Sequence, residues 1–271
     1  MFGLRRSSKG ASNNKRKKLG LVLGSGGARG LAHIGVIKTL LKHNIPIDYI
    51  AGSSAGALVG GLFAAWQDIE RIENLASEIN YQKFLSVFSD LISKAGLFKG
   101  EKAEKFLREQ LGNQKIEDLS VPFRAIATNV TTGQREILDK GCLATAIRAS
   151  SSIPFLFQPT EVDGQLLVDG GICCPLPVDV VRQMGADVVV AVNLYHFSPQ
   201  KTPKLNTLSV AGSSIVLLLY YLAKENEKGA DIVINPQIPY VHLTEFMKGQ
   251  RYIKQGEVQT EKAIEKIRAL L

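Results

Sequence analysis

The turn at residues 52–56, with the sequence G-S-S-A-G, constrains the fold of this chain more than any other segment. It has the form G-x-S-x-G and lies between an apolar run that predicts a buried strand and a helical pattern that begins at Ala55. Gly52 and Gly56 allow a sharp turn, so the hydroxyl of Ser54 stands at the positive end of the helix. Ser54 is therefore the candidate nucleophile. On this string alone a purely structural turn stays open as the alternative.

The first 66 residues predict a β-α-β-α unit, which implies parallel strands. Its strands are expected at residues 19–23 and 47–51, and its helices at residues 31–42 and 55–65. A chain of 271 residues with 45% hydrophobic content can bury one large core. We expect a single α/β domain over residues 19–271.

The remainder of the chain continues to alternate between strand and helix patterns, apart from a mostly helical region at residues 66–119 that we interpret as an insertion or cap. Further strands are predicted at residues 121–130, 136–138, 166–168, 187–192 and 232–234, and helices at 143–149, 172–184, 208–223 and 252–271. Residues 208–223 form the most apolar long stretch and are shorter than a membrane span. We expect a core helix there, and a weakly membrane-associated helix is the alternative.

The formal net charge of +8 is concentrated at the N-terminus. Residues 1–18 contain seven Lys and Arg residues and no acidic residue, which leaves +1 for the remainder. We expect a disordered arm there that makes peripheral contact with an anionic membrane surface, or that acts only as a solubilising tail. No specific nucleic-acid partner is expected, and the absence of an apolar segment after the arm argues against a secretory signal.

The cysteines and histidines indicate a reduced setting without a metal. The chain has an odd number of cysteines, namely Cys142, Cys173 and Cys174. The adjacent pair is poorly suited to a structural disulfide. The four histidines are scattered, and no metal-binding spacing occurs. We expect no metal, and a cytoplasmic protein that contacts the inner face of the membrane peripherally at most.

A glycine-rich loop at residues 24–30, with the sequence G-S-G-G-A-R-G, supplies candidate donors for an oxyanion. Consecutive backbone N–H groups, here those of Gly26 and Gly27, can point at one position, and Arg29 adds a positive charge. Gly24 and Gly30 bound the loop. A phosphate cradle is the competing interpretation, but the loop matches neither the dinucleotide nor the Walker pattern. A structural glycine turn is a third.

Asp169 is the candidate base, because it ends the predicted strand at residues 166–168 and precedes Gly170 and Gly171. A carboxylate at a strand end, buried beside an apolar pocket, has a raised pKa and becomes a better base. For an isolated D-G-G string, a tight turn is the simpler interpretation. His196 and His242 are the alternatives for a histidine-dependent triad, although neither follows a glycine-bounded strand end.

Taken in order, the glycine loop, the serine turn and the D-G-G string resemble the patatin-like phospholipases. The similarity is to short bacterial members related to the catalytic domain of neuropathy target esterase, and it covers residues 19–271. Supporting similarity is found at residues 127–133, 149–154, 175–179 and 185–187. Ser25 stands where the family often has glycine, and Asn129 where it usually has aspartate.

The resemblance implies a three-layer α/β/α sandwich with a mainly parallel sheet. It also implies a lipid acyl hydrolase that uses a Ser54–Asp169 dyad, an oxyanion site of Gly26, Gly27 and Arg29, and no cofactor. Phospholipids or lysophospholipids are the expected substrates. Two alternatives stay open, namely a histidine-dependent hydrolase or acyltransferase and a weakly active, membrane-associated regulatory protein of the same fold.

Overall fold

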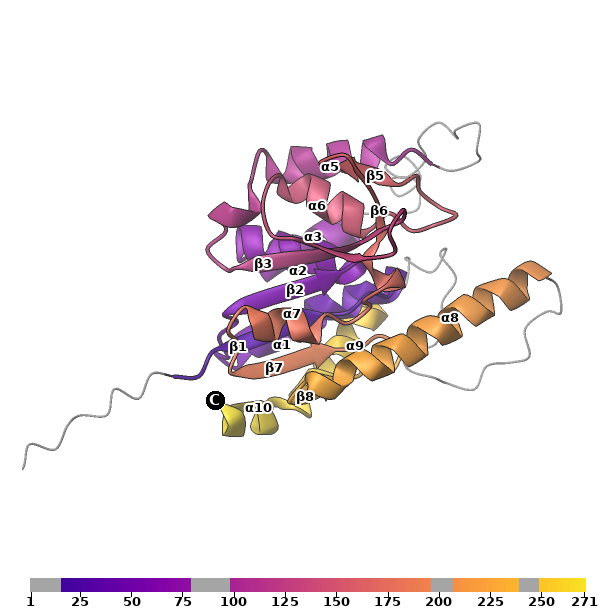
Figure 1. The fold of residues 1–271 in the computed structure, drawn as a ribbon. Helices are drawn as coiled ribbons and strands as arrows, with labels where there is room; N and C mark the ends of the chain where they lie inside the picture. Colours follow the sequence, from indigo (N-terminus) through magenta and orange to yellow (C-terminus); the bar gives the residue numbers. More distant parts are fainter. Residues whose placement is uncertain (1–15, 79–97, 196–206, 239–248) are drawn as a thin grey trace, which may run out of the picture.

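An eight-stranded mixed sheet forms the centre of the molecule in the computed structural model, which describes residues 16–78, 98–195, 207–238 and 249–271 (Figure 1). The strand order is β5-β6-β3-β2-β1-β7-β8, and β4 pairs with β3 off this path. Strands β8, β7, β1, β2 and β3 are parallel, whereas β4, β5 and β6 join antiparallel. The strands are β1 (Leu19–Leu23), β2 (Tyr49–Ser53), β3 (Phe123–Asn129), β4 (Arg135–Leu138), β5 (Thr160–Val162), β6 (Gln165–Asp169), β7 (Val188–Val192) and β8 (Ile232–Ile234).

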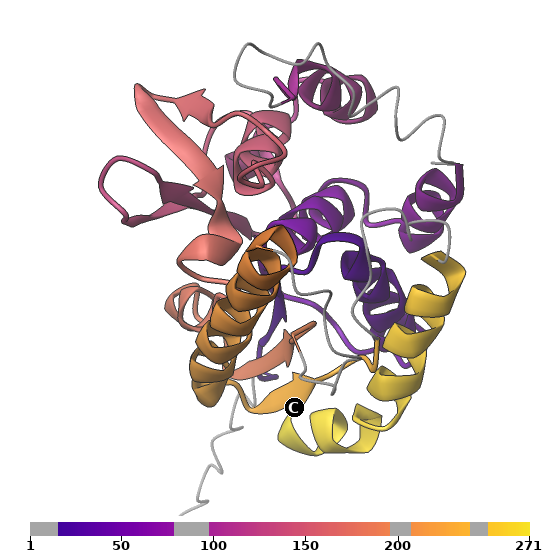
Figure 2. The same ribbon diagram turned by 90° about the vertical axis from the view of Figure 1, so that its right-hand side faces the viewer.

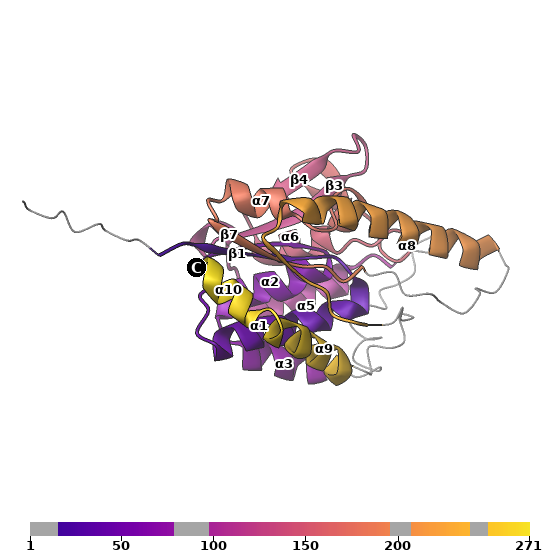
Figure 3. The ribbon, with the colours of Figure 1, turned by 90° about the horizontal axis from the view of Figure 1, so that it is seen from below.

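Helices cover both faces of the sheet, which gives three layers. The view from below shows α7 and α8 on one side and α1, α2, α3, α5, α9 and α10 on the other (Figure 3). The helices are α1 (Ala32–Lys42), α2 (Ala55–Trp66), α3 (Ile69–Glu78), α5 (Glu101–Leu111), α6 (Leu143–Ser150), α7 (Val178–Gln183), α8 (Thr207–Asn226), α9 (Gly249–Glu261) and α10 (Ile264–Leu270). Four short 3₁₀ helices are η1 (Gly27–Leu31), η2 (Ile116–Asp118), η3 (Gly170–Ile172) and η4 (Glu227–Gly229). The predicted α/β/α sandwich is confirmed.

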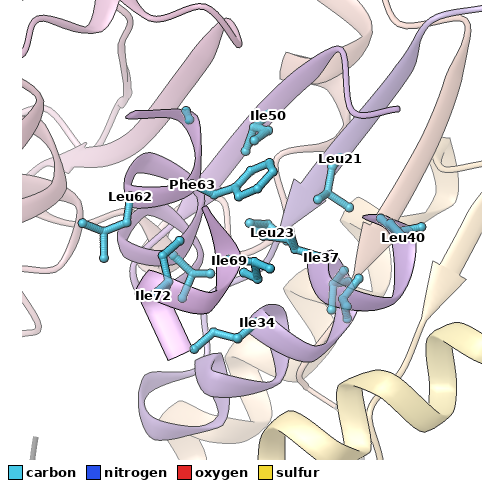
Figure 4. Close-up of a cluster of buried hydrophobic side chains, with 14 of the residues drawn as sticks. Leu21, Leu23, Ile34, Ile37, Leu40, Ile50, Leu62, Phe63, Ile69 and Ile72 are labelled. Carbon is cyan, nitrogen blue, oxygen red and sulfur yellow. The ribbon is translucent and has the colours of Figure 1, made fainter. Parts of the chain in front are cut away.

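The central strands bury both faces, as parallel strands between two helical layers must. Leu21 and Leu23 point into the larger core beneath α1 and α2, where Figure 4 shows them among leucine and isoleucine side chains. Val22, between them, belongs to the smaller core beneath α7. This alternation with a period of two residues explains why the apolar run of β1 contains no polar side chain.

The parallel strands all end at one edge of the sheet, the edge that faces the viewer in Figure 2. The segments that follow β1 and β2 therefore start side by side. The antiparallel strand β6 reaches the same level, because its last residue, Asp169, pairs with Ala127 near the end of β3. Three motifs that are distant in sequence thus meet at this edge.

The expected core helix at residues 208–223 is the main error of the sequence analysis. It is helical, within α8, but Val210, Leu217, Leu218 and Tyr221 are exposed, and the helix projects beyond the sheet edge (Figure 1). An apolar composition does not by itself determine burial, because apolar side chains also occur on protein surfaces. No helix in the described ranges combines the length and apolarity that a bilayer crossing requires.

The last three residues assigned to the basic arm contact the domain. Arg16 forms an ion pair with Asp48 at 2.6 Å, and the backbone N–H of Lys18 donates to the carboxylate of Asp187 at 2.7 Å. Lys17 donates to the carbonyl oxygen of Leu270. Residues 1–15 lie outside the described residues.

Candidate active site

Ser54 occupies a strained turn between β2 and α2. Its backbone has φ 54° and ψ −120°, a conformation that costs energy in a residue with a Cβ. The turn lifts the side chain away from the strand at the N-terminus of α2, where the helix dipole is positive. Ser54 is nevertheless buried. The strand-to-helix context predicted for the G-x-S-x-G string is present.

The side chains of Ser54 and Asp169 meet. Ser54 Oγ donates to Asp169 Oδ2 at 2.5 Å, and the backbone N–H of Gly171 donates to the other carboxylate oxygen at 2.7 Å. Burial raises the pKa of Asp169 to about 6, against the opposing effect of these two hydrogen bonds. A carboxylate of this basicity, bonded to a hydroxyl, can accept the hydroxyl proton.

The glycine loop lies against both members of this pair. A Cβ on Gly30 would lie 2.3 Å from the Cβ of Ala55, directly after the serine. A Cβ on Gly56 would lie 1.9 Å from the carbonyl oxygen of Leu23, and one on Gly171 would lie 2.7 Å from Ser25 Oγ. These separations are too short for any side chain. Glycine at these positions therefore allows the three motifs to touch.

The backbone N–H groups of the loop differ in whether they already donate to a backbone carbonyl. The backbone N–H groups of Gly24 and Ser25 donate to Val192 and Pro175, and that of Arg29 closes the turn onto the carbonyl of Gly26. Within the described part of the chain, the N–H groups of Gly26 and Gly27 have no such acceptor. Gly27 also has a positive φ of 56°, which favours glycine.

Arg29 holds the loop from within. Its Nε donates to the carbonyl of Gly26 at 3.3 Å, and its guanidinium lies 4.8 Å from the centre of the Tyr195 ring. The hydroxyl of Tyr195 accepts a hydrogen bond from Ser25 Oγ at 3.1 Å. Ser25, which stands where the family often has glycine, is therefore held in the loop by a hydrogen bond to Tyr195.

His33, on α1, supports the loop from beneath, and sequence reasoning missed it. It is fully buried, and its Nε2 lies 2.8 Å from the carbonyl oxygen of Gly24. Burial lowers the pKa of His33 to about 4 despite the bond to Gly24, so the ring is neutral. Because a carbonyl only accepts, Nε2 carries the proton and donates it to Gly24. Its position nine residues after Gly24 carries no motif that would have revealed this contact.

Ser150, at the end of α6, fixes the serine turn. Its Oγ accepts the backbone N–H of Ser54 at 3.0 Å and donates to the carbonyl of Ile126. The backbone N–H of Ser54 is therefore already used. The stretch around Ser150 was noted for its family resemblance, but its sequence does not indicate this contact.

Asn129 has a structural role. Its Oδ1 accepts the backbone N–H groups of Thr131 and Thr132, which closes the turn after β3. Aspartate would accept the same two bonds, so this departure from the family pattern leaves the pair of Ser54 and Asp169 untouched.

The remaining candidates concern histidines and metals. His196 and His242 lie outside the described residues. No group of three or more His, Cys, Asp or Glu residues in the described ranges is arranged to hold a metal ion. The described cysteines, Cys142, Cys173 and Cys174, are free thiols.

A serine bonded to a buried aspartate, in a strand-to-helix turn beside a glycine loop, is an arrangement in which a hydroxyl can be activated as a nucleophile. Comparison with known proteins agrees. Residues 21–182 match the family described as patatin-like phospholipase, and the chain belongs to that family. The resemblance seen in the sequence is thereby confirmed.

Relatives in other organisms are similar over about two thirds of the chain. An uncharacterized NTE family protein of Mycobacterium tuberculosis is 42% identical over 177 residues, which cover 65% of this chain and 49% of the relative. The lysophospholipase NTE1 of Yarrowia lipolytica is 36% identical over 179 residues, which cover 65% of this chain and 12% of the relative. The chain thus spans about half the mycobacterial relative and a small part of the yeast one.

The fold has a counterpart of known structure. The crystal structure of VipD from Legionella pneumophila superimposes with a TM-score of 0.52 at 16% identity, and the match covers 92% of this chain and 67% of that one. At this identity the similarity concerns the fold alone.

Proposed function

We propose that this protein is a serine lipid acyl hydrolase that uses a Ser54–Asp169 dyad. The observation that carries the proposal is the 2.5 Å hydrogen bond from Ser54 Oγ to Asp169 Oδ2, made in a buried site where the carboxylate is unusually basic. Membership of the patatin-like phospholipase family supports an acyl ester as substrate.

In the acylation step, Ser54 Oγ attacks the ester carbonyl carbon while its proton passes to Asp169. The carbonyl π pair moves to oxygen and forms a tetrahedral oxyanion. When it collapses, the bond to the leaving alkoxide breaks, and the alkoxide takes the proton from Asp169. The products are the free alcohol or lysolipid and an ester of Ser54.

Deacylation repeats the sequence with water as nucleophile. Asp169 accepts a proton from water as the oxygen attacks the acyl carbon, and it returns that proton to Ser54 Oγ when the acyl bond to the enzyme breaks. Fatty acid is released and the enzyme is regenerated. The same carboxylate therefore acts as base and then as acid in each half of the cycle.

The glycine loop is the proposed oxyanion site. The unused N–H groups of Gly26 and Gly27 are the donors, and loss of one such donor typically costs about 3 to 4 kcal/mol of transition-state stabilisation. Arg29 contributes its charge and holds the carbonyl of Gly26, so that the loop is formed before substrate binds. This pre-organisation is what makes such donors effective.

Phospholipids or lysophospholipids are the proposed substrates, in line with the family and with the lysophospholipase activity in the name of the yeast relative. The protein is proposed to work in the cytoplasm, with the basic residues of segment 1–18 attracted to anionic lipid at the inner face of the membrane. Liposome binding that is unchanged when this segment is deleted would contradict the role given to the arm.

Hydrolysis of a short-chain p-nitrophenyl ester tests the dyad against a histidine-dependent triad. Ser54→Ala and Asp169→Asn are each expected to lower kcat by about 1,000-fold or more, because each removes a group that acts in the transition state. The matched variants His196→Ala and His242→Ala are expected to stay within a few-fold of the parent. A histidine variant as inactive as Ser54→Ala would replace the dyad with a triad.

Labelling by a fluorophosphonate probe separates an enzyme from a regulatory protein of the same fold. The parent protein is expected to label at Ser54, and the Ser54→Ala variant is expected not to label. Folded parent protein that fails to label would favour the regulatory alternative.

A further inference from the structure

Large exposed apolar side chains gather at the edge of the sheet where Ser54 and Asp169 lie. The described residues contain eleven such side chains, and five of them are on α8, which projects past this edge (Figure 1). Two more are connected closely to Asp169: Ile172 follows it by three residues, and Phe155 lies three residues after Ser152, whose carbonyl accepts the N–H of Asp169. An apolar patch at one place on an otherwise polar surface usually marks an interaction site.

One exposed side of α8 is apolar along about three turns. Val210, Leu217, Leu218 and Tyr221 share one helical face, since they follow at spacings of seven, eight and eleven residues. Leu218 is 70% exposed and Tyr221 68%. The sequence has no charged residue from position 205 to 223, and charge returns at Lys224 where the helix reaches the body.

Phe155 is presented to solvent at a cost in backbone energy. It has a φ of 66°, rare for a bulky residue, and it is 84% exposed, so the strain is not offset by packing of its ring. Its loop is tied to the site, because the N–H of Asp169 donates to the carbonyl of Ser152 at 3.0 Å. Ile172 follows Asp169 by three residues and is also exposed.

We propose that these six side chains, Phe155, Ile172, Val210, Leu217, Leu218 and Tyr221, form a docking surface that inserts into the outer part of a phospholipid bilayer. The inference rests on the proposed function in one respect: a lipid substrate must leave a bilayer and reach Ser54, and this apolar surface borders the site it must reach. The helix is not a membrane span, so it lies in the interface and does not cross it.

The proposed occupant is a lipid surface, because the family acts on lipids and the exposed face of α8 carries no charged side chain between residues 207 and 223. A second copy of the chain is the alternative that the test below excludes. Its attraction to lipid is apolar. Binding through it is therefore insensitive to salt, whereas binding through the basic segment 1–18 is weakened by salt.

Sedimentation with phosphatidylcholine vesicles tests the proposal in full-length Ser54→Ala protein, which binds without consuming the lipid. The background protein is expected to bind equally at about 0.1 M and about 0.5 M NaCl, a roughly fivefold change in ionic strength that strongly screens charge–charge attraction. Adding Leu218→Ser with Tyr221→Ser is expected to weaken partitioning about tenfold or more, since each side chain loses apolar burial. Phe155→Gly is expected to weaken it severalfold while relieving the strained backbone.

Leu41→Ser is the matched control, because Leu41 is an exposed leucine at the end of α1, away from this edge. It should bind as the background does. In protein that keeps Ser54, the Leu218→Ser, Tyr221→Ser pair should slow hydrolysis of vesicle lipid but not of a soluble short-chain ester. A variant that loses vesicle binding but still hydrolyses the soluble ester at the parent rate therefore has a docking defect. A parent protein that hydrolyses neither vesicle lipid nor the soluble ester would instead contradict the proposed function.

Three results would overturn the proposal. The first is edge variants that bind vesicles as well as the background protein. The second is a background dimer, measured by light scattering, that these substitutions dissociate, which would make the patch an interface between copies. The third is binding that vanishes at 0.5 M NaCl, which would assign it to the basic segment.

Discussion

At the scale of single residues, the burial of Asp169 disfavours the charged form that the proposed reaction requires. Among the described residues, the buried carboxylate of Asp169 is paired with a hydroxyl and a backbone N–H and with no cation, which is what usually stabilises a buried charge. Its pKa of about 6 records that cost. The same cost provides the basicity with which Asp169 can take the proton of Ser54.

The pH dependence of hydrolysis should report this ionisation. Only the ionised carboxylate of Asp169 accepts a proton, so kcat/KM for a soluble ester is expected to fall about tenfold per pH unit below pH 6 and to level off above it. A profile measured from pH 4.5 to 8 checks this. A rising limb that is abolished by removing a histidine would contradict it.

Stability should move in the opposite direction over the same range. The pKa of Asp169 is raised from 3.8 to about 6 on folding, so the native state holds its proton more tightly than the unfolded state, and stability falls as pH rises between these values. Asp169→Asn is therefore expected to raise the free energy of unfolding by roughly 2 to 3 kcal/mol at pH 8, and by progressively less toward pH 4. Urea unfolding at the two pH values measures it. The exposed Asp118→Asn serves as control, and an Asp169→Asn protein that is no more stable at pH 8 would contradict the account.

At the scale of elements, the site depends on how closely three turns approach one another. The loop after β1 and the turn after β2 are brought to the same edge by the parallel register, and η3 by the antiparallel pairing of Asp169 with Ala127. Glycines let the backbones of these three turns touch. The close contacts of Gly30 and Gly56 make the geometry of the loop depend on that of the serine turn.

Gly30→Ala tests this dependence. The new Cβ would lie 2.3 Å from the Cβ of Ala55, so the loop must move away from the serine turn. We expect a loss of about 1 to 3 kcal/mol in stability and a fall in kcat of about tenfold or more, because small displacements of catalytic groups are costly. Thermal unfolding and ester hydrolysis measure the two effects.

Gly212→Ala is the matched control on α8. A Cβ there meets nothing within 4 Å, so the substitution is expected to leave kcat unchanged and to stabilise the helix by about 0.5 to 1 kcal/mol. Equal effects of the two substitutions on kcat would show that the loop and the serine turn are not coupled.

The sequence predicted elements well where pattern and environment agree. The bounds of β1 match, and β7 differs by one residue, because each is an apolar run buried on both faces. The strand expected at residues 47–51 is instead Tyr49–Ser53, and β5 was missed, because it is three residues long and half exposed. The exposed α8 shows the limit of such reasoning, since a run of Leu and Val looks alike in a core and on a surface.

At the scale of the whole molecule, the sequence predicted residues that the structure brings together at the candidate site, but not the side chains that hold them in place. Ser54, Asp169 and the glycine loop were predictable because they occur in short strings with chemical meaning. His33, Ser150 and Tyr195 were not, because each reaches the site from another element through a single hydrogen bond or ring contact. Such contacts depend on tertiary packing and leave no local pattern.

Two truncations test where the domain begins. Removal of residues 1–18 eliminates the ion pair of Arg16 with Asp48 and the bond from Lys18 to Asp187, whereas removal of residues 1–15 keeps both. The protein that lacks residues 1–18 is expected to have a Tm about 2 to 5 °C lower than the protein that lacks residues 1–15. In a chain of this length, the loss of about 1 kcal/mol of unfolding free energy lowers the Tm by a few degrees. Equal Tm values by calorimetry would move the boundary back to residue 19.

The most direct test of the central claim is mass spectrometry of the products formed from mixed phospholipids and lysophospholipids. Wild-type protein is expected to release free fatty acid and the matching lysolipid or glycerophosphodiester, and Ser54→Ala protein is expected to release neither above background. Fatty acid release by Ser54→Ala at the wild-type rate, or no release by folded wild-type protein from any of these lipids, would contradict the assignment of Ser54 and Asp169 as the dyad of a lipid acyl hydrolase.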